Sequence, residues 1–93
     1  TIGRAGIESL SLANEAGGLS GKPLKALSNY TLARLCQALD GRIPVIGVGG
    51  IMDGVSAADK MAAGASLVQI YTGFIYNGPA LIQDAVQAIK ATQ

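Results

Sequence analysis

Histidine is absent from this sequence of 93 residues, so any imidazole-based catalysis must come from elsewhere. A single cysteine, Cys36, excludes an internal disulfide and fits a reducing compartment. No apolar run approaches the length of about 20 residues that a membrane-spanning helix needs.

Charge is also scarce: only 14% of the residues are charged, while 49% are hydrophobic. A small domain has much surface for its volume, so we expect part of this apolar surface to contact other protein. The seven basic residues are scattered and the net charge is +1, which excludes the basic face that nucleic acid requires. Because the sequence starts at Thr1 rather than at methionine, we expect a piece of a longer chain.

The first half of the sequence predicts a loop followed by a helix. Residues 1–22 have no sustained period and end in the glycine-rich segment 17–21, which predicts a long irregular loop of the kind that is often functional. Ser28 is the expected N-cap of the helix, and Gly41 is expected to end it. The apolar stripe of this helix consists of Leu32, Leu35, Cys36 and Leu39.

Two apolar segments in the second half predict buried parallel strands. Residues 43–48 and 67–71 are short and apolar on both faces, as strands covered on both sides are. Between them, residues 56–59 have the form of a capping box, and Gly64 is expected to close that helix. A helical turn over 72–76 is expected to precede a last helix, whose buried stripe is Ile82, Ala85, Val86 and Ile89.

Strands that alternate with helices indicate parallel βα units. Two strands cannot close a barrel or bury both faces of a sheet. The sequence therefore predicts an α/β chain that is one part of a larger domain, with residues 1–93 belonging to a single domain.

Three glycine-bearing turns carry the candidate site: residues 17–21, 47–50 and 71–73. Glycine allows positive φ and a close approach of the backbone to a ligand. Exposed N–H groups at such turns bind anions, and (β/α)8 barrels commonly hold a phosphate at the loops after their last two strands. The alternative is that these glycines only form turns, and Tyr71 could be an ordinary core aromatic.

Other polar or reactive residues are expected to be structural. Cys36 lies on the predicted buried face of a helix, where cysteine behaves as a small hydrophobic residue. Asp53 and Asp59 fit turn and cap positions, and surface charge is the expected role of Lys22 and Arg42. We therefore assign no catalytic residue and no metal ligand to this sequence.

Three segments closely resemble the C-terminal region of dihydroorotate dehydrogenases: residues 17–21, 41–51 and 63–74. The resemblance extends over essentially the whole chain. It implies the C-terminal portion of a (β/α)8 TIM barrel, consisting of the last two βα units with the preceding loop and helix. Tyr71 and the segment 18–24 resemble the quinone-dependent class 2 enzymes, since class 1 enzymes usually have glycine where Tyr71 stands.

The resemblance implies an FMN enzyme that oxidises dihydroorotate to orotate in pyrimidine (UMP) synthesis, with ubiquinone as the acceptor. The positions that match FMN-binding residues of the family, chiefly at the phosphate end, are Gly21, Gly50, Tyr71 and Thr72. Gly49 and Ser20 are weaker candidates in the same loops. The family's catalytic base, a flavin-contacting lysine and most substrate residues match nothing in this chain, so this chain alone should be inactive.

The class 2 resemblance also implies peripheral membrane association through N-terminal helices that have no match here, on the cytoplasmic side of the inner membrane if the source is bacterial. We expect the isolated chain to self-associate. Two alternatives stay open: a class 1 enzyme or another barrel flavoprotein, and a non-catalytic module for phosphate binding or assembly.

Overall fold

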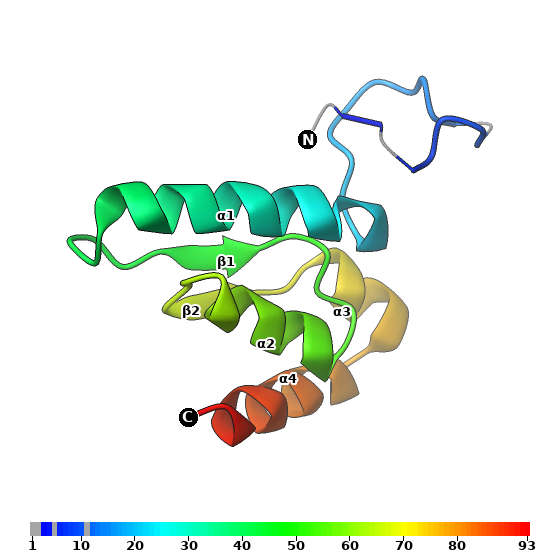
Figure 1. The fold of residues 1–93 in the computed structure, drawn as a ribbon. Helices are drawn as coiled ribbons and strands as arrows, with labels where there is room; N and C mark the ends of the chain where they lie inside the picture. Colours follow the sequence, from blue (N-terminus) through cyan, green and yellow to red (C-terminus); the bar gives the residue numbers. More distant parts are fainter. Residues whose placement is uncertain (1–2, 5, 11) are drawn as a thin grey trace.

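The computed structural model describes residues 3–4, 6–10 and 12–93 and has the predicted alternation of helices and strands (Figure 1). Its elements are the 3-10 helix η1 (Lys22–Leu24), α1 (Lys25–Leu39), β1 (Ile46–Val48), α2 (Gly54–Ala62), β2 (Leu67–Gln69), α3 (Thr72–Asn77) and α4 (Ala80–Ala91). Within the described ranges, no helix has the length and apolarity needed to cross a bilayer.

The two strands pair in parallel, with Ile46 opposite Leu67 and Val48 opposite Gln69. Helix α2 connects them, which is the βαβ arrangement that the sequence predicts. Both strands are shorter than predicted. Pro44 has no backbone N–H to offer to a ladder, so regular pairing begins after it.

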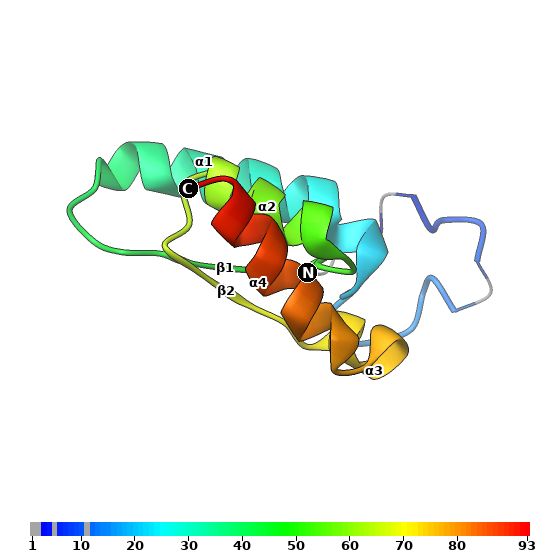
Figure 2. The ribbon, with the colours of Figure 1, turned by 90° about the horizontal axis from the view of Figure 1, so that it is seen from below.

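Only one face of this sheet is covered. Gly47 is buried beneath α1 and α2, and a Cβ at this position would lie 3.1 Å from the Lys60 Cβ and 3.2 Å from a Leu32 methyl group. On the other face, Ile46 is 55% exposed and Leu67 is 63% exposed. Figure 2 shows α1 and α2 on the same side of the strands.

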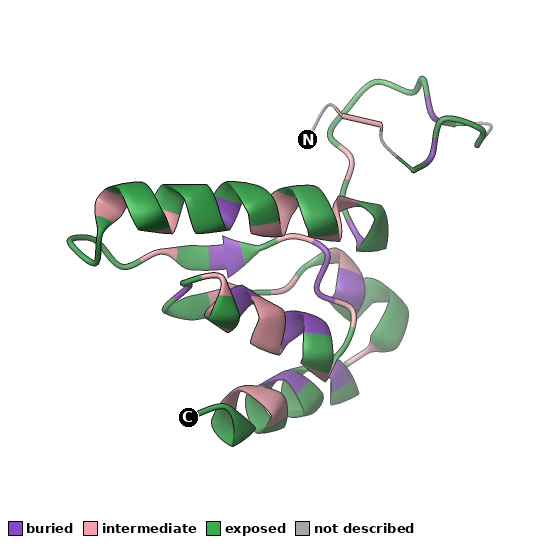
Figure 3. Ribbon diagram, viewed as in Figure 1, coloured by how far each residue is buried: buried purple, intermediate pink, exposed green. Residues whose placement is uncertain are grey.

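The core lies between β2, α2 and α4. Its buried residues are Ile51, Ala57 and Ala85, and the partly buried residues around them are Val68, Ile70 and Ile89. Exposed surface predominates elsewhere (Figure 3). The predicted stripes are therefore only half covered, since Leu35 on α1 and Ile82 and Val86 on α4 remain 47%, 49% and 47% exposed.

Two predicted helix starts are wrong, although both predicted glycine helix ends are confirmed, with Gly64 at a φ of 116° directly after the cap of α2. Helix α1 begins at Lys25, so Ser28 lies inside it and is not its N-cap. Helix α2 is capped by Asp53, whose carboxylate accepts from the Ser56 amide at 2.8 Å, so Ser56 is the third helical residue rather than the cap. Gly41 follows the left-handed cap of α1 with a φ of 76°, as predicted.

The segment before η1 is irregular, as predicted, and extends away from the helices in both ribbon views; residues 1, 2, 5 and 11 lie outside the described part. The Arg4 guanidinium organises it. Its Nε donates to the Ala13 carbonyl at 2.7 Å, and its Nη2 donates to the carbonyls of Glu15 and Gly17 at 2.9 and 3.0 Å. The Arg4 side chain thus connects distant parts of this loop, in addition to backbone turn bonds such as those from Ile7 to Arg4 and from Leu10 to Ile7.

Candidate functional site

A cavity of about 150 Å³ lies where the two strands end. Its lining comes from three parts of the chain: the end of the N-terminal loop with η1, the turn after β1, and the turn between β2 and α3. The lining residues are Ser20, Gly21, Leu24, 48–51 and 69–73. Because parallel strands bring their carboxyl ends to one edge, segments distant in sequence meet here.

All four residues that the sequence singled out line this cavity: Gly21, Gly50, Tyr71 and Thr72. The two weaker candidates, Gly49 and Ser20, line it as well. A side-chain contact joins the loop to α3, because Ser20 Oγ lies 2.8 Å from Thr72 Oγ1. The structure therefore brings the predicted glycine turns together.

The glycines at the cavity are required by the packing of the backbone itself. Gly49 and Gly50 have φ values of 107° and 74°, which side-chain-bearing residues rarely adopt. A Cβ on Gly50 would overlap the Lys25 backbone, 2.7 Å from its nitrogen, and one on Gly73 would overlap the Ile51 carbonyl oxygen. Both turns thus approach a neighbouring main chain too closely for any side chain.

Backbone amides are the available donors at this site. Among the described residues, no acceptor receives the N–H of Gly50 or Tyr71, which lie just beyond the paired strands. The N–H groups of Thr72 and Gly73 lie in the first turn of α3, where helical residues have no partner within the helix. The described lining holds no carboxylate and no cationic side chain. Such unpaired amides around a small cavity favour an anionic guest.

Tyr71 is not a core aromatic within the described chain, because 73% of its surface is exposed. Its backbone carbonyl accepts from the amides of Phe74 and Ile75, which starts α3. Tyr71 therefore lines the cavity without its ring being part of the core.

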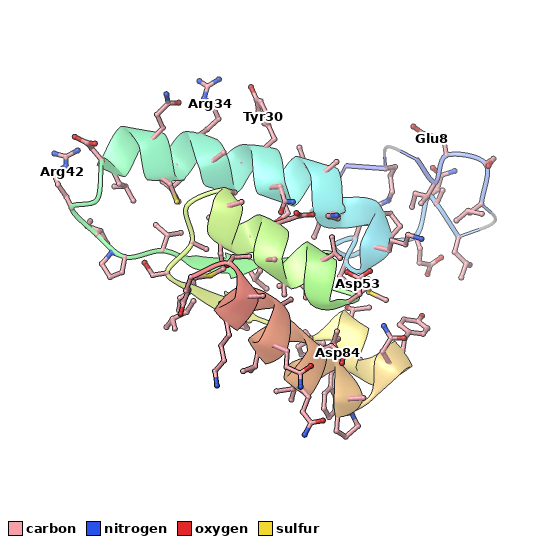
Figure 4. All side chains as sticks on the ribbon, turned by 60° about the horizontal axis from the view of Figure 1, so that its bottom comes forward. Glu8, Tyr30, Arg34, Arg42, Asp53 and Asp84 are labelled. Atoms are coloured by element: carbon pink, nitrogen blue, oxygen red, sulfur yellow. The ribbon has the colours of Figure 1, made fainter. Side chains whose placement is uncertain are left out.

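Asp59 and Arg42, for which the sequence predicts no role in binding, make contacts that stabilise the fold. Asp59 pairs with Lys25 at 2.8 Å, and this hydrogen bond raises the pKa of Lys25. Figure 4 shows Arg42 at the far end of α1, where it donates to the Leu39 and Ala38 carbonyls at 2.9 and 3.1 Å. Within the described part of the chain, no three His, Cys, Asp or Glu side chains are grouped as a metal would need.

Sequence reasoning missed one buried polar group beside the cavity. Lys60 is fully buried, and its Nζ donates to Ser28 Oγ at 2.9 Å and to Asn29 Oδ1. Burial, followed by the charge of Lys25, lowers the pKa of Lys60. Its spacing from the buried Ser56 and Ala57 places it on the inner face of α2, and this periodicity was the available signal.

A family model and the most similar curated proteins point to the same family. A family model described as dihydroorotate dehydrogenase matches residues 3–92. Proteins named dihydroorotate dehydrogenase (quinone) from Azotobacter vinelandii and Stutzerimonas stutzeri are each 58% identical over 91 residues, covering 98% of this chain and 26% of their own length. The chain thus spans about a quarter of the length of the curated relatives it matches.

Solved structures show the same similarity. The structure of DHODH from Eimeria tenella in complex with ferulenol superposes with a TM-score of 0.86 at 36% identity, covering 96% of this chain and 24% of that one. The ligand-free form from the same organism also gives a TM-score of 0.86. The fold is therefore that of a portion of a TIM barrel, as the sequence predicted.

Proposed function

Because the chain belongs to the dihydroorotate dehydrogenase family, we propose that it forms the FMN-phosphate-binding part of a quinone-dependent dihydroorotate dehydrogenase. The observation that carries this proposal is the cavity at the strand ends, which gathers glycine turns and backbone amides without described partners. In (β/α)8 barrels, this edge is where a phosphate commonly binds.

The residues present fit a phosphate group. The cavity volume of about 150 Å³ is several times the roughly 30 Å³ that a water molecule occupies in the liquid. Amides of Gly21, Gly50, Tyr71 and Thr72 would hold the phosphate oxygens. Positive φ values at Gly21 and Gly50 allow these two turns to bend around the cavity. Bound FMN supplies the acceptor for hydride, while this chain binds and orients its phosphate end.

The whole enzyme would oxidise dihydroorotate to orotate in UMP synthesis and pass electrons to ubiquinone. We assign no catalytic residue to this chain, so substrate chemistry belongs to the rest of the barrel. The quinone names of the relatives and the presence of Tyr71 favour this acceptor over fumarate or NAD. Peripheral membrane association, on the cytoplasmic side of the inner membrane if the source is bacterial, completes the proposal.

Ligand binding by the complete protein that carries this chain tests the phosphate site. FMN and riboflavin share the isoalloxazine ring, but riboflavin lacks the phosphate. We expect FMN to bind at least about 100-fold more tightly, because several charge-assisted hydrogen bonds depend on that group. Quenching of flavin fluorescence measures both affinities. Equal affinities would refute a phosphate site.

Steady-state assays of the same protein test the reaction. Dihydroorotate oxidation should proceed with a ubiquinone analogue and should be negligible with fumarate or NAD. The reverse preference would instead support a class 1 enzyme. A protein that binds FMN but leaves dihydroorotate unoxidised with every acceptor would favour another barrel flavoprotein or a non-catalytic binding module.

A further inference from the structure

We propose that Ser20 is a positioning residue that holds the Thr72 hydroxyl ready to donate to the anionic guest, an inference that rests on the proposed phosphate-binding function. Both residues line the cavity at the strand ends, and Ser20 Oγ lies 2.8 Å from Thr72 Oγ1. The two residues are 52 positions apart in the sequence, so their contact closes the end of the N-terminal loop onto α3. In this arrangement Ser20 acts on the guest through Thr72.

Both branches of the Thr72 side chain contact the loop. The hydroxyl meets Ser20, and the methyl group packs against Gly21, where a Cβ would lie only 3.1 Å from Thr72 Cγ2. A β-branched side chain has few χ1 rotamers, so these two contacts together hold Thr72 in one of them. The end of the loop therefore sets where the Thr72 hydroxyl lies.

The number of protons in the hydroxyl pair leaves one donor for a guest. Each hydroxyl carries one proton, and their mutual hydrogen bond uses one of the two. Among the described side chains and backbone groups, neither hydroxyl has a second acceptor. An anion beside Thr72 attracts the Thr72 proton, so Ser20 then donates to Thr72 Oγ1. That donation polarises the Thr72 hydroxyl and strengthens its own hydrogen bond to the anion.

The composition of the cavity makes this neutral donor important. No charged side chain is part of the described lining, so an anion there depends on dipoles held in place. A threonine hydroxyl without a partner rotates about its Cβ–Oγ bond and spends only part of its time aimed at a guest. Ser20 removes this freedom, because its proton occupies one lone pair of Thr72 Oγ1.

A double-mutant cycle on the complete protein tests this role, with FMN and riboflavin affinities measured for each variant. Ser20→Ala removes the partner hydroxyl, and we expect it to weaken FMN binding about fivefold. Thr72→Val keeps the methyl contact with Gly21 but loses the donor, and it should weaken FMN binding about tenfold. Riboflavin binding should stay unchanged in both. In the Thr72→Val background, Ser20→Ala should have no further effect on FMN affinity.

The matched control removes a different side-chain hydrogen bond from the same helix. Asn77, at the other end of α3, donates through Nδ2 to the Met52 carbonyl at 2.7 Å and does not line the cavity. We expect Asn77→Ala to keep the wild-type ratio of FMN to riboflavin affinity, even where it lowers the Tm. A change in this ratio as large as that of Ser20→Ala would overturn the proposal, because the docking of α3 alone would then explain it.

The remaining outcomes are also decisive. Additive losses from Ser20→Ala and Thr72→Val would mean that Ser20 binds the guest by itself, which overturns the positioning role. A lower Tm with the wild-type ratio for Ser20→Ala would overturn it too, and Ser20→Gly takes its place in the cycle if that variant does not fold. A wild-type protein without preference for FMN would overturn the phosphate site itself, so the two failures are distinguishable.

Discussion

At the scale of single residues, two glycines share a positive φ but have different surroundings. Gly50 has a φ of 74° and Gly78 a φ of 73°, so the backbone disfavours an added Cβ at both positions. A Cβ on Gly50 would lie 2.6 Å from the Lys25 Cβ, whereas one on Gly78 would have nothing within 4 Å. The pair therefore contrasts a closely packed glycine at the strand end with an open one.

We expect Gly50→Ala to lower the free energy of unfolding of the complete protein more than Gly78→Ala does. The positive φ costs roughly 1–3 kcal/mol in each variant. The overlap with Lys25 adds roughly 1–3 kcal/mol at Gly50 alone. Urea unfolding measures both variants. Equal losses would mean that α1 moves aside without cost and that Gly50 is retained for the ligand only.

At the scale of elements, α2 has the best-defined helix start in the chain. Asp53 accepts from the Ser56 amide, and the Ser56 hydroxyl accepts from the Asp53 amide at 3.1 Å, which is a reciprocal capping box. Hydrogen bonds from the Ser56 hydroxyl and then from its amide lower the pKa of Asp53 below its ordinary value of 3.8. Since α2 carries Lys60, this cap also sets the register of the buried ammonium.

The cap predicts a pH dependence with a definite sign. A depressed folded-state pKa contributes stability that is present above pH 3.8 and is lost as the pH falls through the lower, folded value. Asp53→Ala should cost about 1 kcal/mol at pH 7 and should flatten the stability profile below pH 4. Thermal unfolding across this range measures it. Asp84→Ala on α4, an exposed carboxylate in Figure 4, is the control and should keep the wild-type acid slope.

The order of the elements could be predicted from the sequence, but two helix starts could not. Apolar periodicity identifies each helix and strand because it reflects burial, which is local along the chain. Polar residues at helix starts are ambiguous, since Asp53 and Ser56 each fit a cap. The choice depends on where β1 ends: the Met52 amide donates to Ser56 Oγ at 2.9 Å and places the serine inside the helix.

Part of the candidate site could likewise be predicted from the sequence, and part could not. Its glycines could be predicted because they follow predicted strands. The contacts from Lys60 to Ser28 and from Ser28 to Val48 span 32 and 20 residues, so no local pattern contains them. Ser28 was therefore assigned to a local cap, although its hydroxyl makes a tertiary contact.

At the scale of the whole molecule, the chain is a thin layer. Its extents are 41 × 33 × 16 Å, and its accessible surface is 6301 Å². A compact monomer of 9.4 kDa would expose only about 5,000 Å². The uncovered sheet face, with Ile46, Val48 and Leu67, and the extended N-terminal segment contribute to the difference.

We expect the isolated chain of 93 residues to self-associate at micromolar concentration, because its sheet has an open apolar face and two unpaired edges. Sedimentation velocity over a range of concentrations measures this. Ile46→Lys combined with Leu67→Lys should reduce association by charging the open face, whereas Gln37→Lys on the exposed side of α1 should not. A monomer with a sharp two-state melt would contradict this prediction.

The cavity at the strand ends presents main-chain atoms, and substitution cannot exchange those as it exchanges side chains. At Gly50 and Gly73 a substitution displaces the chain, because even one carbon atom collides with a neighbouring backbone. Substitutions at these two glycines are therefore expected either to leave the local backbone unchanged or to disrupt it. A compound that engaged these amides would leave few escape mutations that also preserve the proposed phosphate site.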